Sequence, residues 1–214
     1  LHIHPKLFFI LLFSLIGALW FYFKLDYTSI TVPFYGVFEM GFWYIPFFVL
    51  TVGFMSNAVN FTDGLDGLAG GLLVMSYGAF AVLAFFSDLF TLSAFCTVII
   101  GAMLAFLWHN VPPAKFYMGD TGSLALGATL GVIAMMTDSV FVLPIIGFVF
   151  IVEILSVIIQ LTSKKLRNGK KVFHIAPIHH HFEYIGWTES QIVMRAWIVG
   201  GFCTGIGIII GIIS

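Results

Sequence analysis

The sequence predicts an all-α, polytopic integral membrane protein. Of its 214 residues, 60% are hydrophobic and only 9% are charged, whereas soluble domains carry roughly 25% charged residues. Apolar runs that approach the ~20 residues needed to cross a bilayer recur along the whole chain. Several of these runs are joined by very short linkers, such as 87–91 and 138–139, so we expect their helices to pair as antiparallel neighbours.

We expect about seven transmembrane helices in a single transmembrane domain, 1–214. Polar breaks separate the second run from the third and the fourth from the fifth, where Pro112 and Pro113 end a helix. Glycines spaced four apart in the last run favour close helix packing, within the chain or in a homodimer. These glycines are Gly201, Gly205, Gly207 and Gly211. The predicted helices are Leu7–Phe23, Tyr44–Asn60, Gly67–Phe86, Leu92–His109, Ser123–Thr137 (a short one), Val140–Thr162 and Ile192–Ile213.

The basic residues predict the orientation of these helices. If the first helix runs from side one to side two, side two holds only Lys24 of the nine basic residues, so side one is predicted to be cytoplasmic. The acidic residues of the outer loops, Asp26, Glu39, Asp88 and Asp138, are isolated and form no motif. Side one holds Lys6, Lys115, Lys164, Lys165, Arg167, Lys170, Lys171 and Arg195.

Three polar clusters meet at this predicted cytoplasmic face, whereas a pore would place charges along the depth of the bilayer. The net charge is −1, and we expect no nucleic-acid partner. Cys96 and Cys203 both lie in apolar runs and give neither a disulfide framework nor a metal-binding spacing. We interpret them as small packing residues.

The first cluster interrupts apolar sequence between the second and third predicted helices. Its two asparagines and first aspartate are three apart, so they share roughly one helical face, drifting by ~60° per step. Its glycines break the helix and let the backbone approach a ligand closely. Polar groups beside lipid are costly unless they are paired, hydrated or bound to an ion, which indicates a binding site. The last aspartate could instead simply cap the next helix. The residues are Asn57, Asn60, Asp63, Gly64, Leu65, Asp66 and Gly67.

The second cluster runs from Asn110 to Ser123. A helix that begins near Asp120 presents free N–H groups, which suit phosphate, and the carboxylate could hold Mg²⁺ or simply act as an N-cap. Tyr117 could stack on a planar base or lie at the membrane interface as an aromatic anchor. Lys115 is explained equally well as a topology charge and as a ligand contact.

The third cluster, His174 to Glu183, contains three consecutive histidines, His179, His180 and His181. Adjacent side chains project in different directions, so one metal ion is not expected to bind all three. They could contact phosphate or relay protons, bind zinc through His179, His181 and Glu183, or belong to a solvated loop. The zinc-protease pattern HExxH is absent.

Glu153 lies inside an apolar run, where an ionisable group is a functional candidate. We favour a structural role, as a protonated carboxyl group bonded to a neighbouring helix. Together, the acidic residues at the boundary, the helix N-terminus and the basic loop favour a Mg²⁺-dependent reaction on a phosphorylated substrate. The membrane setting suggests that one substrate is a lipid.

Four segments resemble the polyprenyl-phosphate N-acetylhexosamine-1-phosphate transferases. The Pro-Ile-His-His-His-Phe-Glu motif is typical of the phospho-N-acetylmuramoyl-pentapeptide-transferase branch of that superfamily. The resemblance covers essentially the whole chain. The segments are Asn57–Ala69, Phe116–Gly127, Glu153–Gln160 and Ala176–Glu183.

This resemblance implies transfer of phospho-N-acetylmuramoyl-pentapeptide from UDP-MurNAc-pentapeptide to undecaprenyl phosphate at the bacterial inner membrane, giving lipid I and UMP. It implies that Asp120 is the Mg²⁺-binding catalytic aspartate and that His179, a second catalytic candidate, and His180 lie beside the diphosphate. The polyprenyl tail would lie in hydrophobic grooves between helices. The uridine pocket would comprise Asp63, Gly64, Leu65 and Asp66 with Asn110 and Tyr117, next to Asn57 and Asn60.

One departure from the family stands out. Its members carry a paired-aspartate loop, a nucleotide-contacting lysine and several helices upstream, and no Asp-Asp pair occurs here. We therefore expect that this chain is a C-terminal fragment and that it is inactive alone; lipid I synthesis by the 214 residues would contradict this. The alternatives are a sister transferase that uses UDP-GlcNAc, which should lack the triple histidine, a membrane transporter, and, less well supported, a scaffold of a wall-synthesis complex.

Overall fold

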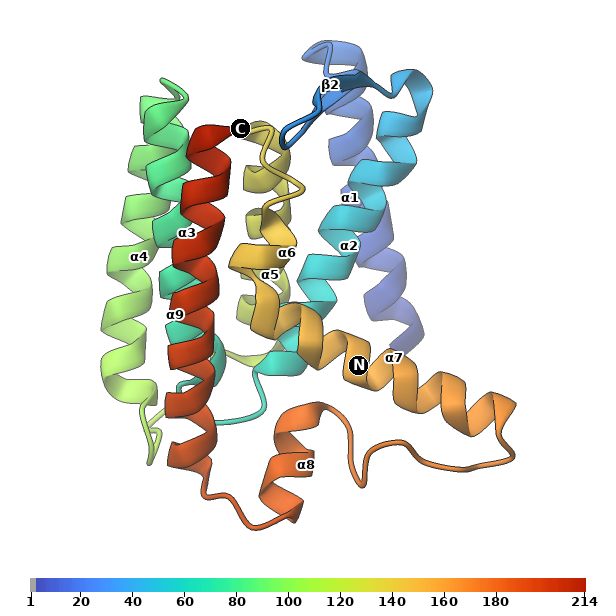
Figure 1. Ribbon diagram of the computed structural model, residues 1–214, viewed down its shortest axis with the longest axis vertical. Helices are drawn as coiled ribbons and strands as arrows, with labels where there is room; N and C mark the ends of the chain where they lie inside the picture. The colour runs from blue at the N-terminus through green and yellow to red at the C-terminus, as the bar shows by residue number, and fades with distance from the viewer. Residues whose placement is uncertain (1–2) are drawn as a thin grey trace.

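The structure is a computed structural model that describes residues 3–214, and it shows an all-α polytopic membrane protein (Figure 1). The predicted fold class is confirmed. The described elements are α1 (Ile3–Lys24), β1 (Ser29–Val32), β2 (Gly36–Glu39), the 3-10 helix η1 (Gly41–Trp43), α2 (Tyr44–Thr62), α3 (Leu68–Phe86), α4 (Phe90–Asn110), α5 (Gly119–Met136), α6 (Leu143–Ile146), α7 (Phe148–Leu166), α8 (Ile178–Tyr184) and α9 (Glu189–Ile213).

Within residues 3–214, six helices are long and apolar enough to cross a membrane: α1, α2 with η1, α3, α4, α5 and α9. The predicted single span Val140–Thr162 is wrong, because this segment divides at Gly147 into α6 and α7. Pro144 lies in the first turn of α6, and α7 carries one acidic and two basic side chains. Figure 1 shows α7 running obliquely away from the other long helices.

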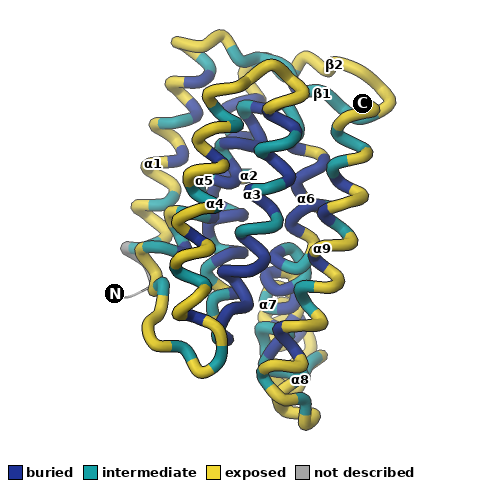
Figure 2. The backbone as a smooth tube through the Cα atoms, turned by 90° about the vertical axis from the view of Figure 1, so that its left-hand side faces the viewer, coloured by how far each residue is buried: buried dark blue, intermediate teal, exposed yellow. Residues whose placement is uncertain are grey.

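The buried residues concentrate on α2 and α3 in the middle of the bundle, whereas α1, α4 and α9 expose apolar side chains on their outer faces (Figure 2). Small residues allow the central helices to approach closely. An added Cβ at Gly127 of α5 would lie 2.5 Å from the carbonyl oxygen of Met55 in α2. Gly207 and Gly211 of α9 face Ile146 and Leu83 of the same chain, whereas Gly205 has no heavy atom within 4 Å of its added Cβ position. A homodimer stays a prediction.

A β-hairpin, which the sequence analysis did not predict, joins α1 to α2. Its antiparallel register places Ser29 opposite Glu39 and Val32 opposite Gly36. The backbone N–H of Thr31 donates to Asp138 Oδ1 at 2.9 Å, and its hydroxyl contacts the other carboxylate oxygen. The interpretation of Asp138 as isolated is therefore wrong, since this carboxylate fastens the hairpin to the turn between α5 and α6.

The loops that carry the three polar clusters lie at one end of the bundle, together with the start of α1 (Figure 1). The opposite end holds the hairpin and the C-terminus. The predicted convergence of the clusters at one end is confirmed. Which end faces the cytoplasm, and whether the chain forms one domain, stay predictions.

Candidate active site

Asp120 lies in the first turn of α5, and its side chain contacts residues of α1 and α2. Its side chain is 53% exposed, and Lys6 of α1 forms an ion pair with its Oδ2. Asn60 of α2 donates to its Oδ1 at 2.9 Å and lies equally close to the hydroxyl of Ser123. The sequence identifies Lys6 only as a topology charge, because a lone lysine before an apolar run carries no signal for a partner 114 residues away.

Asp63 follows the last turn of α2 and faces the same site. Burial, and secondly the nearby charge of Asp120, raise the pKa of Asp63 from its ordinary value of 3.8 to about 6. Asn57, one turn before Asn60, instead donates to the carbonyl of Gly53 in its own helix at 2.7 Å. The helix therefore brings Asn60 and Asp63 to Asp120, while the amide N–H of Asn57 is used within α2.

The turn from Asp63 to Gly67 is held from two sides. Oδ2 of Asp66 accepts from the backbone N–H of Ala114 at 2.8 Å, and the N–H of Asp66 donates to Glu189 of α9 at 2.7 Å. The alternative in which Asp66 caps the next helix is wrong, because the N-cap of α3 is Gly67, at φ +79°. Asp66 instead ties the turn to the 111–118 loop.

Asn110, Leu65 and Tyr117 were predicted as nucleotide contacts, and they have different surroundings. Asn110 is buried, accepts from the N–H of Gly67 at 3.0 Å and donates to the carbonyl of Phe116 at 3.0 Å. Leu65 is buried in the hydrophobic core. Tyr117 is 72% exposed and is free to meet a ligand in solvent. Asn110 therefore supports the backbone around the site, and Leu65 anchors the turn in the core.

The three consecutive histidines have three different environments. His179, on α8, is 1% exposed, and its Nδ1 lies 3.0 Å from Oε2 of the buried Glu153. His180 is partly exposed and pairs with Glu183 at 2.6 Å. The His181 ring stacks on His174, with centroids 5.3 Å apart. The expectation that Glu153 bonds a neighbouring helix is confirmed.

The first and third clusters meet at Gly64. An added Cβ there would lie 2.5 Å from Nε2 of His179, so this histidine packs directly on the 63–67 turn. Among the described residues no hydrogen bond links His179 to Asp120. The turn lies between them, with Asp63 facing Asp120 and Gly64 facing His179.

Asp120 and Asp63 carry the carboxylate oxygens that Mg²⁺ prefers, and the two oxygens of Asp120 bond Lys6 and Asn60 in this structure. The described residues contain no group of three or more His, Cys, Asp or Glu arranged to hold a metal, which also argues against zinc bound through His179, His181 and Glu183. Mg²⁺ is usually held by one or two carboxylates together with substrate phosphates, so it needs no such group. Asp120 and Asp63 supply two carboxylates whose negative charges oppose each other, and a cation relieves that repulsion.

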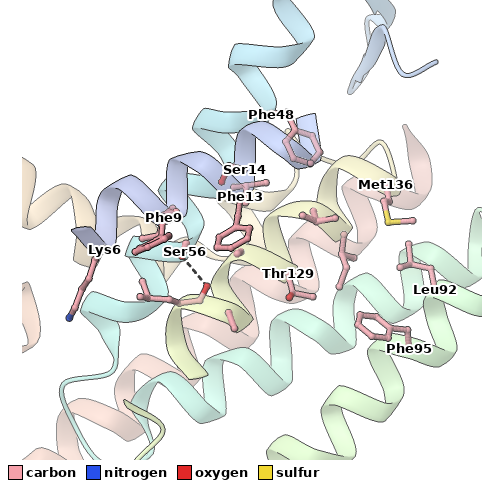
Figure 3. Close-up of a pocket in the computed structure, with 18 residues that line it drawn as sticks. Lys6, Phe9, Phe13, Ser14, Phe48, Ser56, Leu92, Phe95, Thr129 and Met136 are labelled. Carbon is pink, nitrogen blue, oxygen red and sulfur yellow. Dashed lines mark hydrogen bonds between the residues drawn. The ribbon is translucent and has the colours of Figure 1, made fainter. Parts of the chain in front are cut away.

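An apolar groove of about 690 Å³ lies between α1, α2, α4 and α5 (Figure 3). Lys6 lies at one end of it, and Phe9, Phe13, Phe48 and Phe95 line it further along. The hydroxyl of Ser56 is already used, since it donates to the carbonyl of Leu124 at 2.9 Å. The groove therefore presents hydrocarbon along its length and a cation where it meets Asp120.

The raised pKa of Asp63 predicts a pH-dependent effect of Asp63→Asn on the metal-free protein. Stability from the protonated carboxyl is complete below about pH 3.8 and is lost as the pH rises through about 6. Because the side chain is partly exposed, we expect the stability advantage of Asp63→Asn to grow by about 1 kcal/mol between pH 5 and pH 8. Unfolding in EDTA at both pH values measures this difference. The exposed Asp88→Asn serves as the control, and an advantage that shrinks with rising pH would contradict the prediction.

Comparison with known proteins gives one family and a set of close relatives. Residues 1–138 match the profile of glycosyl transferase family 4. Proteins named phospho-N-acetylmuramoyl-pentapeptide-transferase are similar to the chain: that of Chloroflexus aggregans is 45% identical over 191 residues (86% of the chain and 52% of the relative). That of Shouchella clausii is 47% identical over 175 residues (82% and 54%), and that of Listeria monocytogenes is 42% identical over 187 residues (87% and 56%). The chain spans about half the length of the curated relatives it matches.

Proposed function

The chain belongs to glycosyl transferase family 4, and from this premise we propose that it transfers phospho-N-acetylmuramoyl-pentapeptide from UDP-MurNAc-pentapeptide to undecaprenyl phosphate. The products would be lipid I and UMP, in the first membrane step of peptidoglycan synthesis. The observation that carries the proposal is the convergence of Asp120, Asp63 and His179 around one turn at one end of the bundle. The names of the relatives support this choice of donor.

The reaction forms one phosphorus–oxygen bond and breaks another. An oxygen of undecaprenyl phosphate attacks the phosphorus that carries the sugar, the bond to the bridging oxygen of the diphosphate breaks, and UMP leaves with that oxygen. Catalysis of such a step rests on positioning and on neutralising phosphate charge. Lys6 supplies a cation beside Asp120, and the first turn of α5 presents its backbone N–H groups to an anion.

We assign Mg²⁺ to Asp120, with Asp63 as the second carboxylate. When bound, the ion would neutralise charge on the diphosphate and on the leaving UMP. Asn60 donates to one oxygen of Asp120 and so fixes the direction in which this carboxylate points. Loss of that hydrogen bond would leave the carboxylate held only by Lys6 among residues 3–214.

The nucleoside would lie over the 63–67 turn. The exposed ring of Tyr117 can stack on the uracil base, while the His179 ring packs against Gly64 of the turn. Asp66, Leu65, Asn110 and the amide of Asn57 would act indirectly, by holding the turn and its flanking loop. His179 would lie beside the diphosphate, with His180 next to it, since their ring centroids are 4.2 Å apart.

The apolar groove beside Lys6 is the proposed place for part of the polyprenyl chain. Its hydrocarbon lining suits an isoprenoid, and Lys6 at its end would meet the lipid phosphate next to Asp120. A photoreactive polyprenyl phosphate should label Phe9 or Phe13 in the full-length protein. Labelling confined to other helix faces would remove the groove from this proposal. The protein would reside in the bacterial inner membrane with the site on the cytoplasmic face.

The experiment compares donors on purified full-length protein with undecaprenyl phosphate and Mg²⁺. We expect product from UDP-MurNAc-pentapeptide and none from UDP-GlcNAc. Product from UDP-GlcNAc alone would support the sister transferase instead, although the triple histidine favours the muramoyl branch. Uptake of intact donor into liposomes without any product would support a transporter. Polar residues on broken helices at mid-membrane are the sign of that class.

A further inference from the structure

One face of α7 is polar and buried, although the helix is otherwise apolar up to Leu161. Its polar side chains recur at intervals of three and four residues, so they lie on a single stripe. Gln160 binds both N–H groups and a carbonyl in the 172–173 segment, and Ser163 donates to the carbonyl of Lys170 at 2.9 Å. Gln160 and Ser163 of this stripe thus hold the chain that leads into α8. Its members are Glu153, Ser156, Gln160 and Ser163.

Glu153 differs from the rest of the stripe, because it is ionisable and bonds a side chain instead of backbone. Its Oε2 lies 3.0 Å from Nδ1 of His179 and 3.5 Å from the N–H of the same residue. Both side chains are almost completely buried, at 4% and 1% exposure. A carboxylate at this depth needs a partner, and Nδ1–H is the donor that satisfies it.

This contact occupies Nδ1 of His179, so within residues 3–214 Nε2 is the ring nitrogen that is left without a hydrogen bond. With Glu153 as a carboxylate, its oxygen can only accept, which places the proton on Nδ1 and leaves Nε2, on the opposite side of the ring, without one. Nε2 is buried without a hydrogen-bond partner among the described residues. It points at Gly64, where an added Cβ would lie 2.5 Å away. A glycine at that position is what allows the ring to reach the turn.

We propose that Glu153 is a positioning residue that holds His179 in the Nδ1–H form and aims its Nε2 at the 63–67 turn, where the donor diphosphate would bind. The inference rests on the proposed function. Glu153 itself touches no substrate; it acts through His179. Carboxylate–histidine pairs fix the tautomer and orientation of catalytic imidazoles in this way, and replacing such a carboxylate by its amide leaves geometry intact but permits the wrong tautomer.

The test uses full-length protein and three variants. Glu153→Gln should lower kcat by about 10² to 10⁴-fold with KM for the donor within about threefold, because binding survives and orientation does not. Glu153→Asp, which keeps the charge, should recover part of that loss. Ser156→Ala is the matched control, since this buried hydroxyl bonds only the carbonyl of Glu153 within the same helix; we expect it to keep kcat. A kcat within threefold of wild type for Glu153→Gln would show that the pair only anchors α8.

Nitrogen-15 spectra of histidine-labelled protein report the tautomer of His179 independently of the transfer assay. The signal of His179, assigned by its loss in His179→Asn, should show a protonated Nδ1 in the wild type. A neutral ring protonated only at Nε2 would overturn the proposal, even if Glu153→Gln fails to fold. If the wild type makes no lipid product, the proposed function fails while the spectrum still decides the tautomer. An active wild type with an unaffected Glu153→Gln variant overturns only the role of Glu153.

Discussion

Asp120→Asn is expected to abolish phosphosugar transfer in the full-length protein while leaving it folded. The substitution keeps the size and the hydrogen-bonding oxygen but removes the negative charge that pairs with Lys6 and would hold Mg²⁺. Losing one electrostatic contact to a developing charge typically costs about 10² to 10³-fold in kcat, and loss of the metal should cost at least about 10³-fold. Because the ion pair is partly exposed, the free energy of unfolding should change by less than about 1 kcal/mol.

Asp88→Asn is the matched control for that experiment. Asp88 is exposed in the turn between α3 and α4, at the opposite end of the bundle, and its φ of 59° is a conformation that asparagine also tolerates. We expect wild-type kcat and stability. Activity of Asp120→Asn within tenfold of wild type would remove Asp120 from the metal site.

Gly127→Ala is expected to have the largest effect on the bundle. An added Cβ would lie 2.5 Å from the carbonyl oxygen of Met55 and 2.8 Å from the Cα of Ser56. Both atoms are backbone and cannot rotate away, so α5 must move off α2. Overpacking of this kind costs about 1–3 kcal/mol. The same movement separates Asn60 from Asp120, so transfer should also fall by more than about tenfold.

Thermal unfolding in detergent and the transfer assay measure the two effects of Gly127→Ala. Gly101→Ala, on α4, is the control, because no heavy atom lies within 4 Å of its added Cβ position. This control should keep its activity and gain up to about 1 kcal/mol from helix propensity. Unchanged unfolding of Gly127→Ala would mean that α2 and α5 are less tightly packed than the structure has them.

Most of the helices could be predicted from the sequence, because an apolar run of spanning length encodes a membrane helix directly. The fifth helix begins four residues before its predicted start, at Gly119 instead of Ser123. The Val140–Thr162 prediction failed because hydropathy alone does not weigh Pro144 and Gly147, which interrupt the run, or show that α7 would run obliquely. The hairpin was missed because its stability depends on Asp138, far away in sequence.

The candidate site could be predicted only as far as the segments that form it. Polar clusters in short loops at one end were visible from the order of the helices. The pairs within the site join residues that are remote in sequence, such as Lys6 with Asp120 and Glu153 with His179. No periodicity links such residues, so the sequence identifies Lys6 only as a topology charge and leaves a helix cap open as an alternative for Asp66. Their partners come from packing and are found only in the folded chain.

The most direct test of the account is UMP release by purified full-length protein from UDP-MurNAc-pentapeptide, with and without undecaprenyl phosphate. We expect UMP and lipid I in equal amounts, only when both substrates and Mg²⁺ are present. Undecaprenyl phosphate that is never consumed, while the donor stays intact, would contradict it.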